Sequence, residues 1–443
     1  MKKLLILAYD FPPYVSVGGL RPYNWFLYLN EFGIEPIVVT RQWSNFYGSH
    51  LDYIAPGVSD QVIEEQMNCG IIFRTPYRPN LSNRLLLKYG DSRFKFIRKL
   101  ISGYFEFAQF LIPVGPKSEL YHFAKKYLSE NKVDAIIATG DPFILFSYAS
   151  KLSKEFKTPW IADYRDTWVQ DKTRSGNKFT KKWNAFFERK YLSNASTVTT
   201  VSSFIIKQLQ QNLPNKRYEI LLNGYNPHDI EAVNQISQTS NDFTISFAGT
   251  IYKWHPISSF LAVCNNLVSN GTLTNFRINF YGVNLNGELD QVIEQNFPQL
   301  KEKVRIYPKI EDQDLVKKLA KSNAFLLFND YSILGTKIFN YLGIKRRILL
   351  CYSDDLNSKN LKSKFYNLQE FSDESKQLQE EVIRETNSGI IVKDESHLMD
   401  VLTSLHKEFN SNGFLSCNSN GIEKYSRKSQ AKKLANIFDE LIY

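Results

Sequence analysis

Apolar and polar positions alternate in blocks along the chain. Short runs rich in Ile, Val and Leu are bounded by turn residues and separated by stretches long enough for a helix. This pattern is typical of parallel strands that helices cover on both faces. In the first half the runs lie at 4–9, 36–40, 71–74, 135–139, 160–164, 197–201 and 219–222. They predict one complete doubly wound sheet.

A second series of apolar runs starts after Asn223-Gly224. Its members lie at 243–248, 276–281, 304–307, 325–328, 348–352 and 389–392. Between them, the segments 256–268, 312–320 and 397–406 carry apolar residues at three- and four-residue spacing, which indicates amphipathic helices. The second half therefore predicts another Rossmann-like sheet.

Together the two series predict an α/β protein with two Rossmann-like, doubly wound domains that face a cleft. The N-terminal domain spans 1–222, the C-terminal domain spans 223–424, and an amphipathic helix follows at 425–443. The sequence leaves open whether this helix packs back across the domain junction or caps its own domain. Open parallel sheets bind ligands outside the carboxyl ends of their strands. We therefore expect one sheet edge to hold a donor and the other an acceptor.

Composition places the chain among folded proteins without a membrane span. A chain of 443 residues is longer than one hydrophobic core of ordinary size accommodates, and 43% of the residues are hydrophobic. The mean hydropathy is −0.33, and no apolar run is long enough to span a membrane. The four cysteines form no C-x-x-C pair, and none of the six histidines makes a ligand pair with a nearby Cys or His. We expect no disulfide framework, no metal site and a reducing cytoplasm.

The net charge of +10 is unevenly distributed. Residues 74–99 contain eight basic residues and one acid, Asp91, interleaved with aromatic and aliphatic side chains. Such a segment favours an anionic membrane surface, although a solvated helix with an ordinary buried side is the alternative. No helix-turn-helix, zinc-finger or RNP-like pattern accompanies the segment, so we expect no nucleic-acid partner.

A pair of glycines follows the first predicted strand. Residues 10–21 read DFPPYVSVGGLR and lead into an aromatic helix. Gly18 and Gly19 at a helix N-terminus allow backbone N–H groups to approach an anion, helped by Arg21. A sharp turn without a ligand is the alternative interpretation.

Further segments follow in a fixed order: PWIADYRDTW at 159–168, VTTVS at 198–202, NGYN at 223–226, FAGTIY at 247–252 and KIFNYLG at 337–343. Together with the glycine pair they resemble glycosyltransferase family 4 and its bacterial relatives of surface-polysaccharide assembly, over nearly the whole chain. The resemblance implies the GT-B fold and a nucleoside-diphosphate sugar, commonly UDP-linked, held mainly by the C-terminal domain. It also implies a glycan or lipid-linked acceptor held mainly by the N-terminal domain, transfer with retention, no obligatory metal or other cofactor, and a place at the cytoplasmic face of a membrane.

The resemblance also implies a set of donor-binding residues. A leaving nucleoside diphosphate gains negative charge, which fixed cations and backbone N–H groups can stabilise. The matching cations are Lys253 and Lys337, and Gly335 and Thr336 stand at the N-terminus of the nucleotide-binding helix. The remaining predicted contacts are Gly249, Thr250, Tyr307 beside the nucleobase, and Ser332 and Asn340, which stand where family members typically carry two glutamates.

Charged residues follow two strands of the first domain. Asp141 ends one strand, and Asp163, Arg165 and Asp166 end the next. In the functional interpretation Asp163 or Asp141 positions an acceptor hydroxyl or contacts the donor sugar, and Arg165 holds them. In the structural alternative Arg165 pairs with Asp163 or Asp166 only to stabilise the loop. The sequence assigns no general base.

Two other functions fit the same fold. A GT-B nucleotide-sugar epimerase needs no acceptor, and the basic segment at 74–99 argues against it. A non-catalytic relative that serves as a binding partner is consistent with Ser332 and Asn340 in place of glutamates. Gly18-Gly19, Lys337 and the acidic cluster at 163–166 argue against that loss of activity.

Overall fold

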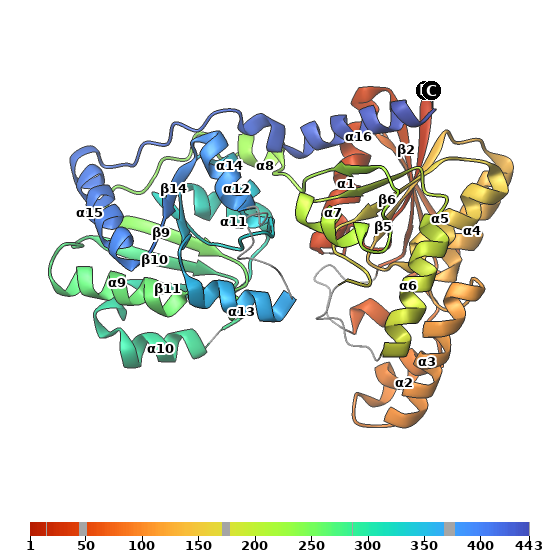
Figure 1. The fold of residues 1–443 in the computed structure, drawn as a ribbon, viewed down its shortest axis with the longest axis horizontal. Coiled ribbons are helices and arrows are strands. Elements are labelled where there is room, and N and C mark those ends of the chain that lie inside the picture. Colours follow the sequence, from red (N-terminus) through yellow and green to blue (C-terminus); the bar gives the residue numbers. More distant parts are fainter. Residues whose placement is uncertain (15, 44–50, 171–177, 286, 367–376, 443) are drawn as a thin grey trace. The chain divides into compact units, whose positions relative to one another are not determined.

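The computed structural model describes residues 1–14, 16–43, 51–170, 178–285, 287–366 and 377–442. Contacts divide the chain into two compact units (Figure 1). Unit 1 comprises Met1–Leu222 together with Lys428–Tyr443, and unit 2 comprises Asn223–Arg427. Both units are parallel-sheet, Rossmann-like domains, so the predicted fold class is confirmed. No helix within the described ranges is long and apolar enough to cross a membrane.

Unit 1 contains an eight-stranded sheet in the order β3-β4-β2-β1-β5-β6-β7-β8. The strands are β1 (Lys2–Leu7), β2 (Ile34–Arg41), β3 (Ile63–Met67), β4 (Gly70–Thr75), β5 (Ala135–Gly140), β6 (Trp160–Tyr164), β7 (Thr197–Thr200) and β8 (Tyr218–Ile220). All neighbours pair in parallel except β3, which runs antiparallel to β4. Strand order reverses between β1 and β5, which places the switch point of the sheet there.

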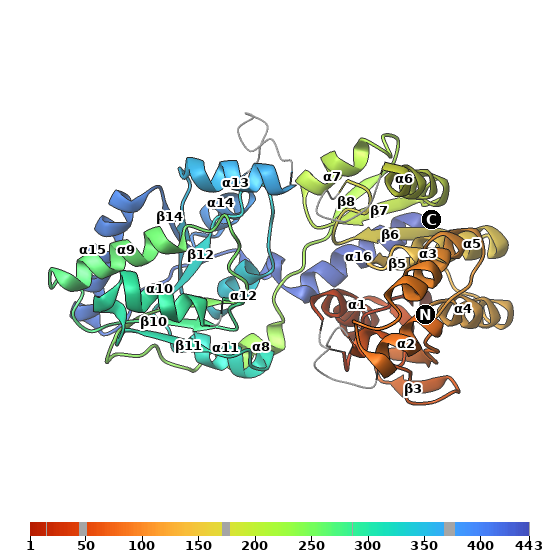
Figure 2. The same ribbon diagram turned by 90° about the horizontal axis from the view of Figure 1, so that it is seen from below.

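Helices cover both faces of this sheet (Figure 2). They are α1 (Val17–Tyr28), α2 (Leu81–Tyr89), α3 (Lys95–Leu111), α4 (Ser118–Glu130), α5 (Ile144–Phe156), α6 (Lys178–Leu192), α7 (Ser203–Gln210) and α16 (Arg427–Ile442), with short 3-10 turns at Leu29–Phe32 and Asp52–Ile54. Side chains alternate along β1, as in any strand. Leu5 and Leu7 join the core under α4, α5 and α6, whereas Leu4 and Ile6 join the core under α1 and α16.

The last helix of the chain, α16, belongs to the core of unit 1. Its buried apolar residues include Leu434 and Phe438, which share one cluster with Leu4 and Ile6 of β1. Polar contacts join the helix to unit 1: Lys428 with Glu31 at 2.6 Å, Lys2 with Asp439 at 2.8 Å, and the Leu222 N–H with Gln430 Oε1 at 2.8 Å. Arg217 also pairs with Glu440. The open question of the sequence is thereby answered, because the helix packs on the N-terminal domain.

Unit 2 contains a six-stranded, fully parallel sheet in the order β11-β10-β9-β12-β13-β14. The strands are β9 (Phe243–Ala248), β10 (Phe276–Tyr281), β11 (Val304–Tyr307), β12 (Ala324–Phe328), β13 (Arg347–Cys351) and β14 (Gly389–Val392). Its helices are α8 (Pro227–Glu231), α9 (Ile257–Ser269), α10 (Glu288–Asn296), α11 (Asp312–Ala320), α12 (Lys337–Ile344), α13 (Leu356–Tyr366), α14 (Leu378–Thr386) and α15 (Glu395–Asn412), with 3-10 turns at Pro298–Leu300 and Ile422–Tyr425. The switch point lies between β9 and β12.

Candidate functional site

The carboxyl ends of β9 and β12 bring three predicted donor residues together. Gly249, directly after β9, has a φ of 91°, and a Cβ added there would lie 3.0 Å from Lys337 Cε. Lys337 begins α12, and its Nζ donates to the Thr250 carbonyl oxygen at 2.6 Å. Glycine therefore leaves the space that the lysine side chain occupies. Burial lowers the pKa of Lys337 to about 8, although the charge of Asp330 acts in the opposite direction.

Asp330, two residues after β12, anchors the aromatic segment that follows β9. Its Oδ1 accepts from Trp254 Nε1 at 3.0 Å and lies 3.2 Å from His255 Nε2. His255 Nδ1 accepts from the Tyr252 N–H at 3.2 Å, so Nε2 carries the proton of the neutral ring and donates to Asp330. Burial lowers the pKa of His255, which keeps this ring neutral at pH 7.

The carboxylate of Asp330 remains ionised although it is buried. Burial alone would raise its pKa, but the His255 hydrogen bond and the charges of Lys362 and Lys337 hold the pKa below its usual range. Asp330 Oδ2 also lies 3.5 Å from the position of a Cβ on Gly335. Asp330 thus connects the end of β9 with the loop that leads into α12. Sequence analysis gave it no role.

Of the other predicted donor residues, two lie at the start of α12 and one is buried. Thr336 is the N-cap residue of α12, next to Lys337, and Asn340 lies in the first turn of the same helix, half-buried. Ser332 is only 2% exposed, so its predicted contact with the transferred sugar does not fit its burial.

Lys253 and Tyr307 lie apart from the contacts around Lys337. Lys253 is exposed and follows Tyr252 in the loop after β9. Tyr307 ends β11, the edge strand of the sheet, and its ring stacks on Tyr281 with a centroid distance of 4.9 Å. Their predicted roles as second cation and nucleobase contact remain predictions.

The glycine pair of unit 1 makes room for neighbouring groups. A Cβ on Gly18 would collide with the Arg165 guanidinium, and one on Gly19 would lie 3.2 Å from the backbone of Phe11. The Gly18 N–H donates to Ser16 Oγ and the Gly19 N–H donates to the Ser16 carbonyl oxygen, each at 3.0 Å. Both N–H groups are therefore engaged in capping α1. Their contact with an anion stays a prediction, and in this structure both groups bond to Ser16.

Asp163 and Arg21 form a buried ion pair. Arg21 Nη2 lies 2.6 Å from Asp163 Oδ1, and Arg21 Nε lies 3.1 Å from Oδ2. The Thr199 hydroxyl also donates to Asp163 Oδ1 at 2.7 Å, and Arg21 Nη1 donates to the Leu221 carbonyl oxygen. Asp163 is 0% exposed and Arg21 is 4% exposed. Their predicted roles, substrate contact and anion contact, do not fit this burial, and the pair joins α1, β6 and β7.

Arg165 holds the loop after β5 through backbone oxygens. Its Nε donates to the Gly140 carbonyl oxygen at 3.0 Å and its Nη2 to that of Asp141 at 3.4 Å. Of the two interpretations of Arg165, the contact with Asp141 agrees with the one in which it holds that residue, although through the backbone and not the carboxylate. Its catalytic role stays a prediction. Its guanidinium still lies at the carboxyl edge of the sheet, next to Gly18.

Asp10 is a polar residue of this edge that the sequence analysis did not single out. Its Oδ2 accepts from the Ser16 hydroxyl at 2.7 Å, whereas its buried Oδ1 has no hydrogen-bond partner within the described part of the chain. Burial raises the pKa of Asp10, while the Ser16 hydrogen bond and the Arg165 charge act in the opposite direction. Its position directly after a buried strand was the available signal.

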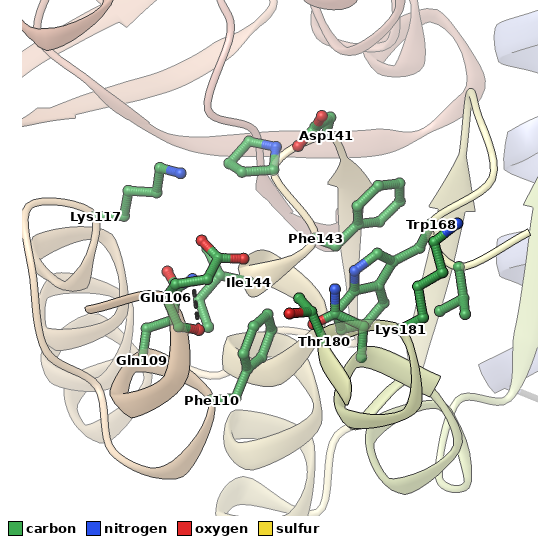
Figure 3. Close-up of a pocket in the computed structure, with 13 residues that line it drawn as sticks. Glu106, Gln109, Phe110, Lys117, Asp141, Phe143, Ile144, Trp168, Thr180 and Lys181 are labelled. Carbon is green, nitrogen blue, oxygen red and sulfur yellow. Dashed lines mark hydrogen bonds between the residues drawn. The ribbon is translucent and has the colours of Figure 1, made fainter. Parts of the chain in front are cut away.

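A cavity of about 380 Å³ opens beside the carboxyl end of β5 (Figure 3). Figure 3 shows residues reaching it from α3, from α6 and from the loop that follows β5. Its lining residues are Glu106, Gln109, Phe110, Lys117, Asp141, Pro142, Phe143, Ile144, Trp168, Val169, Thr180, Lys181 and Asn184. Asp141 is the lining residue that the sequence also assigned to a site. The remaining lining residues come together only through tertiary packing.

No protein-family model matches the chain, and no curated protein matches it in sequence. Solved structures do resemble it. A sucrose-phosphate synthase from Thermosynechococcus elongatus aligns with a TM-score of 0.60 at 14% identity, covering 100% of this chain and 99% of that chain. HepE from Anabaena, solved in complex with UDP-glucose, aligns with a TM-score of 0.53 at 12% identity over 99% and 100%.

A third structure is an α,α-trehalose-phosphate synthase (UDP-forming) from Burkholderia xenovorans in complex with glucose-6-phosphate. It aligns with a TM-score of 0.55 at 9% identity, covering 99% of this chain and 100% of that chain. At these identities the likeness concerns the fold. It confirms the predicted GT-B fold class over the full length of the chain.

We expect Asp163→Asn to destabilise unit 1 by about 3–5 kcal/mol, because it leaves the buried Arg21 charge without a counterion. Urea unfolding followed by pulse proteolysis measures this change. Asp166→Asn is the matched control, since Asp166 is exposed and follows the same strand. Equal midpoints for the two variants would contradict the structural role of the pair.

Proposed function

We propose that the protein is a metal-independent glycosyltransferase that moves a hexosyl group from a UDP-sugar to a lipid-linked glycan during surface-polysaccharide synthesis, with retention at the anomeric carbon. The observation that supports this most is the partly buried Lys337 at the switch point of the unit 2 sheet. Ligands bind at such points in open parallel sheets. The fold is shared with HepE, which was solved with UDP-glucose.

The chemistry requires a site that stabilises the leaving diphosphate. The Lys337 ammonium has three N–H donors, so it can keep its bond to the Thr250 carbonyl oxygen and still bind a phosphate oxygen. The N-terminus of α12 adds unsatisfied backbone N–H groups and the positive end of its dipole. Asn340, in the first turn of α12, would accept one ribose hydrogen bond through Oδ1.

Retention needs no carboxylate nucleophile. The bond between the anomeric carbon and the phosphate oxygen breaks, the acceptor oxygen bonds to the same face of that carbon, and the departing phosphate oxygen takes the acceptor's proton. The charge that develops on the diphosphate is the one that Lys337 would stabilise. In unit 1, Asp141 and Asp10 supply carboxylate oxygens for an acceptor hydroxyl at the sheet edge.

The membrane partner is proposed from the surface of α2, α3 and α6. Phe96, Leu100 and Tyr104 follow one another at four-residue spacing on α3 and are 74%, 60% and 61% exposed. On α6, Phe179 and Phe186 are 63% and 53% exposed. Exposed basic residues surround these side chains: Arg84, Lys88, Arg93, Lys95, Lys99, Lys181, Lys182 and Lys190. We call this the basic apolar face, and it suits an anionic bilayer at the cytoplasmic side.

Three basic residues of the predicted segment have acidic partners within the protein: the exposed Arg78 pairs with Glu119 at 3.3 Å, and two others are largely buried. Arg74 pairs with Glu65 at 2.6 Å, and Arg98 pairs with Asp91 at 3.4 Å. Their side chains are 12% and 14% exposed. They therefore serve the fold of this region, and the test of membrane contact rests on the exposed cations.

For the donor site, we expect Lys337→Ala to weaken UDP binding roughly 10- to 100-fold, as for the loss of a charged hydrogen bond. Isothermal titration calorimetry measures the affinity, and Lys301→Ala, an exposed lysine of the same unit, should bind like the wild type. Failure of the wild type to bind UDP, GDP or ADP would instead support a non-catalytic binding partner. Conversion of a UDP-sugar without any acceptor would support the epimerase.

The pH dependence of UDP binding should follow the Lys337 ammonium, whose pKa is about 8. Below this value the side chain is charged in the free protein. Above it, binding must take up a proton, so the affinity should fall by up to tenfold per pH unit. Lys337→Arg keeps its charge and should flatten this dependence between pH 7.5 and pH 9.5. The same pH dependence of UDP affinity in both proteins would contradict the proposal that Lys337 binds the diphosphate.

For the membrane, we expect the triple variant Arg93→Gln, Lys95→Gln, Lys99→Gln to bind vesicles with phosphatidylglycerol roughly 100-fold more weakly, since each cation contributes about 1 kcal/mol. Flotation against vesicles of phosphatidylcholine alone isolates the charge effect. The control triple Lys126→Gln, Lys132→Gln, Lys154→Gln removes the same charge from exposed positions on another side of unit 1. Equal flotation of the two triples would exclude the basic apolar face as the docking surface.

A further inference from the structure

We propose that the cavity between α3 and α6 binds the terminal sugar of the acceptor, and that this sugar is uncharged. The inference rests on the proposed glycosyltransferase function and adds the class of acceptor. Its volume of about 380 Å³ is at the lower end of small-molecule sites, which suits a short saccharide rather than a long glycan. The cavity lies entirely within unit 1, at the sheet edge that also carries Asp10 and Arg165.

The cavity wall contains a hydrogen-bond acceptor atom without a partner among the described residues. Asn184 Oδ1 is buried and has no hydrogen-bond partner within the described ranges. A buried polar oxygen without a partner is costly, so it is satisfied when a donor enters. The side chains of Glu106 and Asp141, which line the same cavity, add further carboxyl oxygens. The wall is rich in acceptor oxygens, and sugar hydroxyl groups are the matching donors.

The described lining contains two basic and two acidic side chains. Among the described lining residues, the formal charges of Lys117 and Lys181 balance those of Glu106 and Asp141. Burial lowers the pKa of Lys117, and the nearby charges of Asp141 and Glu106 act against this shift. These carboxylates already compensate the Lys117 ammonium. A phosphate on the sugar would add negative charge beside two carboxylates and would be repelled.

Aromatic side chains complete the wall. Phe143 and Trp168 stack with a centroid distance of 5.3 Å and an interplanar angle of 5°. Phe110 also stacks on Trp168, with a centroid distance of 5.3 Å. The cluster is rigid because all three side chains are at most 6% exposed. The rings line the cavity together with the polar side chains and offer apolar surface to the C–H groups of a sugar ring (Figure 3).

Helix α3 links this cavity to the basic apolar face. Glu106, Gln109 and Phe110 line the cavity, whereas Phe96 and Leu100 of the same helix are exposed on the face. Phe96 and Leu100 lie near the start of α3, and the lining residues lie near its end. A ligand with a sugar at one end and an apolar chain at the other would match both regions of the helix, which is why the terminal sugar is assigned to the cavity.

The test compares neutral and phosphorylated sugars without any nucleotide present. Saturation-transfer NMR is recorded with glucose, galactose and N-acetylglucosamine, each beside its 6-phosphate. We expect at least one neutral sugar to bind the wild type more tightly than its 6-phosphate. Asn184→Leu should weaken that binding roughly tenfold, the value of one hydrogen bond. The double variant Glu106→Gln, Asp141→Asn should shift the preference toward the 6-phosphate, because it leaves Lys117 and Lys181 uncompensated.

The proposal is overturned if every 6-phosphate binds more tightly than its neutral partner, if no neutral sugar binds, or if the charge-removing double variant leaves the preference unchanged. Unaltered melting temperatures of the variants separate a lost contact from a lost fold. The binding of UDP and of neutral sugars to Lys337→Ala tests the donor site and the cavity separately. If UDP binding fails in every protein while neutral sugars still bind, the cavity assignment stands and the glycosyltransferase function falls.

Discussion

Parallel strand pairing brings the carboxyl ends of β9 and β12 to one edge of the unit 2 sheet, and those of β1, β5 and β6 to one edge of the unit 1 sheet. Residues that are far apart along the chain become neighbours for this reason alone. Gly249 meets Lys337, and Asp10 comes near Asp141 and Arg165. The polar groups of both candidate sites have their positions because the strands beneath them are buried on both faces and cannot shift.

Burial then decides which of these polar groups remain available to a ligand. Arg21 and Asp163 satisfy one another and stay inside the scaffold. Asp330 is held by Trp254 and His255, and through them it fixes the loop beside Lys337. A charged group at a sheet edge is therefore a candidate for substrate contact only when its own partners leave an atom unused. Asp10 Oδ1 meets that condition within the described residues, and Oδ1 of the neutral Asn184 on α6 likewise has no partner there.

The sequence predicted most of the fold because apolar runs mark buried parallel strands directly. The run 276–281 coincides with β10, and 389–392 coincides with β14. Strand β3 was missed, since its sequence IEEQM is mostly polar and it pairs at the sheet edge. The cavity between α3 and α6 was also beyond sequence reasoning. Its lining residues carry no local motif and come together only when two helices pack beside β5.

The place of α16 has a consequence for how the protein is made. Strand β1 and helix α16 lie on either side of unit 2 in the sequence, yet Leu434 and Phe438 of α16 complete the core over Leu4 and Ile6. Unit 2 is synthesised between these two parts and can finish its own sheet first. The nascent N-terminal domain therefore carries an uncovered apolar face until α16 has been synthesised, and exposed apolar surfaces of this kind favour aggregation. Chaperone binding during synthesis would be directed to that face.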